Sequence, residues 1–375
     1  MHREPCAPMA NDDEVIISCT ILDNSTIAEA LVHYSVDGGD HLTVSMSTND
    51  DSLFSAVVPT SGASFISYYI SATDDGADQS EAKTSVHPYD IDAEQLGFHL
   101  ADELTIDMVQ QTPWERGNTL YEGCVVTLSG VVTADTAQYN SSYSSYALQN
   151  GSDQWSGLIF DTEEIVPLSR GQEATITGLI TDNDPDWDFK FGGNTRLINA
   201  EVSLGSQLSE PAFLNVSCED VSLLSEEVES YEGVLVKLSN VTISSVNDFD
   251  WMITDESGFE TLLDDDMANM EADNFLSTLV EGQELAYVSG IFNFSYGSYK
   301  IQIRDVNDIG GSLGINDDIQ VNPYSYSLMG NYPNPFNPET QIRFSIGNQE
   351  NVKLFIYDMM GRQVNSLING ETFKS

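Results

Sequence analysis

The sequence predicts an all-β protein of several domains, and three observations lead to this prediction. Apolar and polar residues alternate over much of the chain, which is typical of strands with one buried face. Turn residues such as Gly and Asp separate the alternating segments. One unit of about 100 residues occurs twice in tandem, which points to repeated small domains. With 375 residues, of which 41% are apolar, the chain is long enough for two to four domains with their own cores.

Residues 13–95 form the first predicted unit. Alternate residues from Ala30 to Val36 are apolar, residues 37–40 (Asp-Gly-Gly-Asp) turn the chain, and Leu42 to Met46 return it as a hairpin. This pattern resembles an immunoglobulin- or fibronectin-like sandwich. We therefore expect a β-sandwich at the N-terminal end.

Two copies of one unit follow, at 100–206 and 207–312. The tripeptide Tyr-Glu-Gly at 121–123 opens an apolar strand and recurs at 231–233. The tripeptide Gly-Gln-Glu at 171–173 recurs at 282–284. This spacing predicts two barrels that each fold on their own.

Alternation in the second copy predicts five strands, near 233–246, 249–254, 258–263, 283–293 and 298–304. Between the third and fourth strands, we expect Asp266 to cap a helix whose apolar face contains Met267, Met270, Leu276 and Leu279. Five strands with a helix in this position are the order of an OB-fold barrel.

The Tyr-Glu-Gly strand opening and the Glu-Gly-Gln turn into the fourth strand also resemble the OB-like repeats of secreted multidomain bacterial proteins. Some of those proteins are extracellular nucleases. The resemblance covers about 200 residues, and it implies the barrel fold more strongly than it implies a function.

The C-terminal segment, 322–375, carries a distinctive motif. Its residues are Asn331, Tyr332, Pro333, Asn334, Pro335, Phe336, Asn337 and Pro338, followed by Tyr357, Asp358, Gly361 and Arg362. The prolines favour extended backbone before a strand at 341–346, and a turn at 358–361 joins strands at 351–357 and 363–368. The motif strongly resembles the Por-type C-terminal sorting domain of type IX secretion, a pattern shared by the Ig-like domain of flagellar hook-capping proteins. The resemblance implies a β-sandwich that the type IX secretion machinery of the outer membrane reads as an address.

The charge distribution places a boundary before this segment. Residues 1–318 contain 56 acids and nine bases, whereas residues 319–375 contain four of each. A Gly- and Asp-rich stretch at 310–318 reads as a linker, so we expect the boundary near residue 316. The sorting domain departs from its family at Gly347, where many members have Pro, and it ends before the final strands. Because an apolar signal-peptide region is also missing, we expect a truncated segment of a larger exported protein, secreted or held at the outer cell surface.

The net charge of −47 disfavours binding to nucleic acids or anionic membranes, because such binding needs Lys and Arg to displace counterions. The sequence contains no run of 18 apolar residues, so it predicts no transmembrane segment. We found no nucleophile elbow, phosphate loop or metalloprotease motif, and all five histidines lie in the first 99 residues. The sequence therefore predicts a noncatalytic protein with a binding or scaffold role. Two alternatives are accessory modules of a larger extracellular hydrolase or nuclease, and a plain spacer in an adhesin.

Four aromatic residues of the repeats are candidates for stacking on a ligand: Trp187, Trp251, Phe292 and Phe294. Because residues 101–318 contain 39 acids and seven bases, a neutral glycan or a protein is a better ligand than a polyanion. The alternative interpretation is that these aromatics fill the small barrels.

The sequence predicts no definite metal site and no cofactor. Clustered acids at 182–188 and 264–266 would allow weak calcium binding, and solvated acidic loops are the alternative. Cys124 aligns with Val234 of the second copy, which predicts a small buried apolar residue. Export would allow a disulfide between Cys6 and Cys19.

Overall fold

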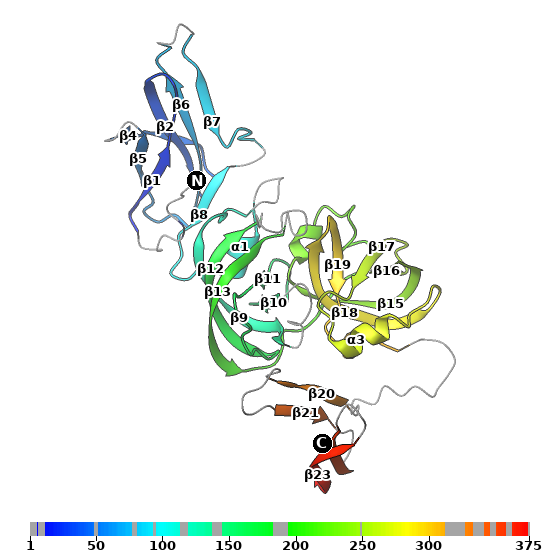
Figure 1. Ribbon diagram of the computed structural model, residues 1–375. Coiled ribbons are helices and arrows are strands. Elements are labelled where there is room, and N and C mark those ends of the chain that lie inside the picture. Colours follow the sequence, from blue (N-terminus) through cyan, green and yellow to red (C-terminus); the bar gives the residue numbers. More distant parts are fainter. Residues whose placement is uncertain are drawn as a thin grey trace. The chain divides into compact units, whose positions relative to one another are not determined.

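The computed structural model shows an all-β protein with a few short helices, which confirms the predicted fold class (Figure 1). The structure describes residue 6 and the ranges 12–48, 52–76, 81–92, 95–112, 119–136, 145–182, 194–247, 250–311, 327–332, 341–345, 350–357 and 362–373. Two compact units are present, Met1–Leu313 and Gly314–Ser375. Their division lies close to the boundary that the charge pattern predicts.

The N-terminal part of the first unit contains two sheets. One has the order β1-β5-β4, from Glu14–Thr20, Leu53–Pro59 and Ser47–Thr48. The other has the order β3-β2-β6-β7, with β8 also paired to β6, from Leu42–Ser45, Ile27–Val36, Phe65–Asp74, Thr84–His87 and Leu96–His99.

The two sheets share one apolar core, to which Ile17 and Val58 contribute from the first sheet and Val32 and Ile66 from the second. Burial alternates along β2, as the sequence pattern predicts for a strand with one face in the core. Strand β8 pairs with β6 and continues this part of the chain beyond the predicted end at residue 95.

The first barrel consists of β9, β10, β11, β12 and β13, preceded by the short helix α1 (Ile106–Gln110). Its strands span Val125–Ala134, Tyr146–Gln149, Gly157–Phe160, Gln172–Thr181 and Arg196–Gln207. The order β10-β11-β13-β12-β9 closes on itself, with β11 and β13 parallel and the other pairs antiparallel.

The second barrel repeats this topology. Strands β15 to β19 span Leu235–Val246, Asp250–Thr254, Glu260–Asp264, Glu284–Ser295 and Ser298–Gln302. They lie in the order β15-β16-β17-β19-β18, and pairing of β15 with β18 closes the sheet. The short strand β14 (Leu214–Asn215) joins β15, and two 3₁₀ helices, η2 (Val228–Tyr231) and η3 (Val306–Asp308), flank the barrel in sequence.

The glycines of the repeated Tyr-Glu-Gly motif explain why the motif recurs. Gly123 and Gly233 have φ of +77° and +71°, in the left-handed region that favours glycine. Each glycine donates its backbone N–H to the fourth strand of its own barrel, Gly123 to Ile180 O at 2.9 Å and Gly233 to Phe292 O at 2.8 Å. The motif therefore forms the turn whose backbone hydrogen bond holds the start of the first strand beside the fourth strand.

Helix α3 (Met270–Leu276; Figure 1) lies between β17 and β18 in the chain, where the sequence predicts a helix. Asp266 does not cap it. The cap is Asn269, whose side chain accepts hydrogen bonds from the backbone N–H groups of Glu271 and Ala272. Asp266 belongs instead to a tight turn in which its own N–H donates to Asp264 Oδ1 at 2.9 Å. The helix therefore begins three residues later than the acid run suggests.

The second unit contains two antiparallel strand pairs. Strand β20 (Ser327–Tyr332) pairs with β21 (Gln341–Ser345), and β22 (Glu350–Tyr357) pairs with β23 (Gln363–Phe373). Three of these strands coincide with strands expected from the sorting-domain motif. Of the motif residues, Asn331 and Tyr332 lie in β20, Tyr357 ends β22 and Arg362 lies just before β23. Residues 333–338, Asp358 and Gly361 lie outside the described residues.

Candidate functional site at the junctions of the β units

Two of the four aromatic residues predicted to stack on a ligand lie in a barrel core. Trp251 and Phe292 are 7% and 0% exposed and belong to the core of the second barrel, so neither offers a ring to a ligand. Phe294 is half-buried and packs edge to face on Tyr299, with ring centroids 4.9 Å apart. Trp187 lies outside the described residues. For Trp251 and Phe292 the stacking prediction is wrong, because a barrel this small fills its interior with large side chains.

The acid runs considered for calcium have different surroundings. Asp182 is buried, and it accepts hydrogen bonds from Thr119 N at 2.8 Å and from Thr195 Oγ1 at 2.6 Å. Residues 183–188 lie outside the described residues. In the second run, burial and the neighbouring charges of Asp264 and Asp273 together raise the pKa of Asp265 to about 6.

An apolar seam joins the two barrels. It consists of one cluster with members from both barrels, namely Ala134, Ala147, Ile159, Leu235, Met267 and Ile291. The backbones also meet without intervening side chains. A Cβ added to Gly157 would lie 2.1 Å from the backbone carbonyl carbon of Gly233, so only glycine fits at this contact.

Polar groups cross the same seam. Gln149 of β10 is fully buried, and its Oε1 accepts a hydrogen bond from Leu235 N of β15 at 3.0 Å. The backbone N–H of Trp155 donates to Ser230 O of η2 at 2.6 Å. Through these bonds, buried polar groups of each barrel have hydrogen-bond partners in the other barrel.

Arg304 is the most buried charged group of the seam, at 1% exposure. Its Nη2 and Nε donate to the two oxygens of the Asp308 carboxylate, at 2.7 and 2.9 Å. Its Nη1 reaches across to the first barrel and donates to Thr133 O in β9 at 2.8 Å. From the first barrel, Arg170 forms ion pairs with Asp305 and Glu210. The bidentate geometry offsets the cost of burying the guanidinium.

A group of acids also lies at the seam. Glu232, from the repeated Tyr-Glu-Gly motif, is 2% exposed, and its Oε1 has no hydrogen-bond partner among the described residues. Burial raises its pKa well above the usual range, and the charges of Glu229 and Asp182 add to this effect. Burial and Asp182 also raise the pKa of Glu229 to about 7. The Tyr299 hydroxyl hydrogen-bonds to Glu232, and burial together with this carboxylate raises the tyrosine pKa.

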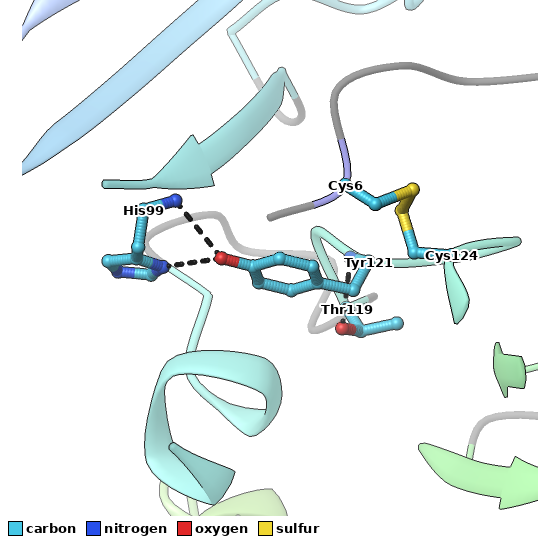
Figure 2. The surroundings of a disulfide bond; sticks show 5 residues. All are labelled: Cys6, His99, Thr119, Tyr121 and Cys124. Carbon is cyan, nitrogen blue, oxygen red and sulfur yellow. Dashed lines mark hydrogen bonds between the residues drawn. A yellow bond between two sulfur atoms is a disulfide. The ribbon is translucent and has the colours of Figure 1, made fainter. Parts of the chain in front are cut away.

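A second junction links the N-terminal sandwich to the first barrel (Figure 2). Cys6 and Cys124 form a disulfide with a Cα–Cα distance of 5.4 Å. Beside it, the Tyr121 hydroxyl accepts the backbone N–H of His99 at 3.0 Å and lies 3.0 Å from the His99 ring Nδ1. Both contacts join the start of the first barrel to segments that precede it in sequence.

The disulfide corrects two cysteine predictions. Cys6 packs against the core of the first barrel and pairs with Cys124, which is buried as predicted but is not a plain apolar residue. Cys19 lies in β1 opposite Phe54 and is a free, half-buried thiol, so the Cys6–Cys19 disulfide that export would allow is not formed. No local spacing signals a bond between residues so distant in sequence.

An open groove of 640 Å³ lies on the first barrel, where β9, β12 and β13 meet the segment that leads to the second barrel. Most of its lining residues are small or polar, including Ser129, Thr175 and Ser203. Glu173 is the one charged residue among those that line it. The groove therefore carries little charge for a strongly acidic protein.

Comparison with known proteins finds no protein-family model that matches the chain and no match among curated proteins. Among the described residues, no helix has the length and apolar character needed to cross a membrane.

The environment of Glu232 predicts a pH dependence. Because its pKa is higher in the folded protein than the value of about 4.3 in the unfolded chain, stability falls as the pH rises above that value. We expect Glu232→Gln, which resembles the protonated acid, to unfold like the wild type near pH 4 and to be more stable at pH 8. Chemical denaturation across this pH range measures the difference. The exposed Glu226→Gln is the matched control, and an equal gain in both variants would contradict the assignment.

The disulfide predicts a redox dependence. Cys6→Ser removes a crosslink between residues 118 positions apart, so we expect a loss of about 2–4 kcal/mol in the free energy of unfolding. A reducing agent should lower the stability of the wild type and leave Cys6→Ser unchanged. Cys19→Ser, which alters a free thiol, should retain the full response to reduction. A wild type that is insensitive to reductant would refute the pairing.

Proposed function

We propose that the chain is a noncatalytic scaffold of an exported protein, in which the two barrels form a stiff body that carries the sandwich. The barrel seam is the observation that supports this role best. Its apolar cluster, its backbone contact, the Arg304–Thr133 hydrogen bond and the Arg170–Asp305 ion pair all hold one barrel against the other. Rigid spacing is what such a connection provides, because domains joined by a single flexible linker move independently.

The chemistry of the described residues fits a noncatalytic role. Several deeply buried charged and amide side chains make structural contacts, as Arg304 does with Asp308 and Gln149 with Leu235. His99, which could otherwise act as a base, contacts the Tyr121 hydroxyl at a domain junction, and burial lowers its pKa. Acid–base catalysis needs such groups to face a substrate.

Export by type IX secretion is supported by the C-terminal motif and by the disulfide. Disulfides persist in the periplasm and outside the cell but are rare in the cytosol. The Cys6–Cys124 bond therefore favours an oxidising location, secreted or at the outer surface. The motif from Asn331 to Pro338 supplies the address by resemblance.

A binding role, where present, fits a neutral partner. The groove on the first barrel has hydroxyl-bearing residues, a single carboxylate and no Lys or Arg among the described residues that line it, so a polyanion is not matched to it. A neutral glycan or an uncharged protein surface matches this lining.

The export proposal is tested in a bacterium with type IX secretion, using the chain behind a cleavable signal peptide. We expect the protein in the medium or at the cell surface when the translocon is intact and in the periplasm when it is disabled. Deletion of residues 322–375 should cause the same periplasmic retention. Export that needs neither the translocon nor this segment would contradict the proposal, and hydrolase or nuclease activity of the full gene product would favour the accessory-module alternative.

A further inference from the structure

The turn between β17 and α3 brings three carboxylates together. One carboxylate oxygen each from Asp264, Asp265 and Asp266 can lie within 4.8 Å of the others. Asp264 is buried, and the other two are half-buried, so the group is not a simple solvated surface run. An acidic cluster needs a further observation before it can be read as a site.

Gln302 supplies that observation. It is 1% exposed, and its Oε1 has no hydrogen-bond partner among the described residues. In the parallel pairing of β17 with β19, Gln302 lies opposite Asp264. The residues just before them, Leu263 and Ile301, are paired and lie in the barrel core.

Because side chains alternate along a strand, Asp264 and Gln302 point together to the opposite face. Lys300 confirms this direction, since it lies two residues before Gln302 and its Nζ forms an ion pair with Asp264 Oδ2. An acceptor oxygen that is buried without a donor costs free energy. A cation between Asp264 and Gln302 would satisfy it.

The charge balance also favours a cation. Asp273 of α3 lies close enough for its charge to raise the pKa of Asp265, which brings a fourth carboxylate to the group. Four carboxylates and the single ammonium of Lys300 leave a formal charge of 1 − 4 = −3 when all are ionised. One divalent cation would reduce this charge to −1.

We propose that the Asp264–Asp266 turn and the amide oxygen of Gln302 bind one Ca²⁺ ion. All the donors are oxygens, which hard cations prefer, and Ca²⁺ accepts irregular coordination more readily than Mg²⁺. The expected affinity is that of extracellular calcium modules, with a Kd of about 10⁻⁴ to 10⁻³ M.

Bound calcium would stiffen the barrel pair. Met267 follows the turn directly and belongs to the apolar cluster between the barrels. A cation that fixes residues 264–266 would therefore fix the position of a seam residue. This inference goes beyond the proposed scaffold role, and the calcium site can exist or fail whether or not the protein is exported.

Isothermal titration calorimetry with CaCl₂ on the full chain, first stripped with chelator, tests the site. We expect one saturable site in the wild type. The Asp265→Asn/Asp266→Asn double variant should lose it, and Gln302→Met, which keeps the size but removes the amide oxygen, should weaken it about tenfold or more. The control is Glu163→Gln/Glu164→Gln, which removes two exposed charges in the first barrel and should bind like the wild type. Melting curves in chelator establish that each variant is folded.

Each result decides the assignment. Loss in the double variant with weakening in Gln302→Met supports it, as does a rise in Tm with CaCl₂ beyond that with NaCl of equal ionic strength. No saturable binding by the wild type overturns it. Binding that survives in the double variant also overturns it, because the calcium then lies at another acid run such as 182–188. An unchanged Kd in Gln302→Met removes Gln302 from the site.

Discussion

The burial of Arg304 is the constraint on which the fused barrels depend. A guanidinium withdrawn from water is tolerated only when its donors are occupied and its charge is paired. Asp308 of the same barrel supplies the paired charge, and Thr133 O of the other barrel accepts a further donor. The buried arginine of the second barrel therefore has all these hydrogen bonds only when the first barrel packs against it. This dependence distinguishes the pair from two domains on a string.

The seam also explains why the glutamate of the repeated Tyr-Glu-Gly motif has different surroundings in the two barrels. In the first barrel, the exposed Glu122 accepts hydrogen bonds from Asp182 N at 2.6 Å and from the Thr181 hydroxyl at 3.0 Å. Its counterpart Glu232 occupies the same place in the second barrel but is covered at the seam. The local backbone requirement is shared, because the following glycine has positive φ in both copies. The difference in burial comes from the neighbour, and repetition alone does not reveal it.

The sequence predicted those features whose causes are local. Alternation located the strands of the second barrel to within a few residues, and the repeated glycines marked the turns that close each barrel. The partner of Cys6, the cover over Glu232 and the acceptor for Arg304 depend on contacts between segments distant in sequence. The role of the aromatic residues was ambiguous for a related reason. The sequence pattern around Trp251 is the same whether its face of the strand is buried in the core or exposed to a ligand. The helix cap was misplaced because an acid run also forms turns.

Hydrogen exchange of the full chain, compared between the wild type and Arg304→Met, tests most directly whether the two barrels form one cooperative body. Methionine keeps apolar bulk but cannot donate to Thr133 or pair with Asp308. If the seam couples the barrels, amide protection falls in β9 and β12 of the first barrel as well as in β18 and β19 of the second. A loss of protection confined to the second barrel would contradict the coupling and show that the first barrel is stable without its partner.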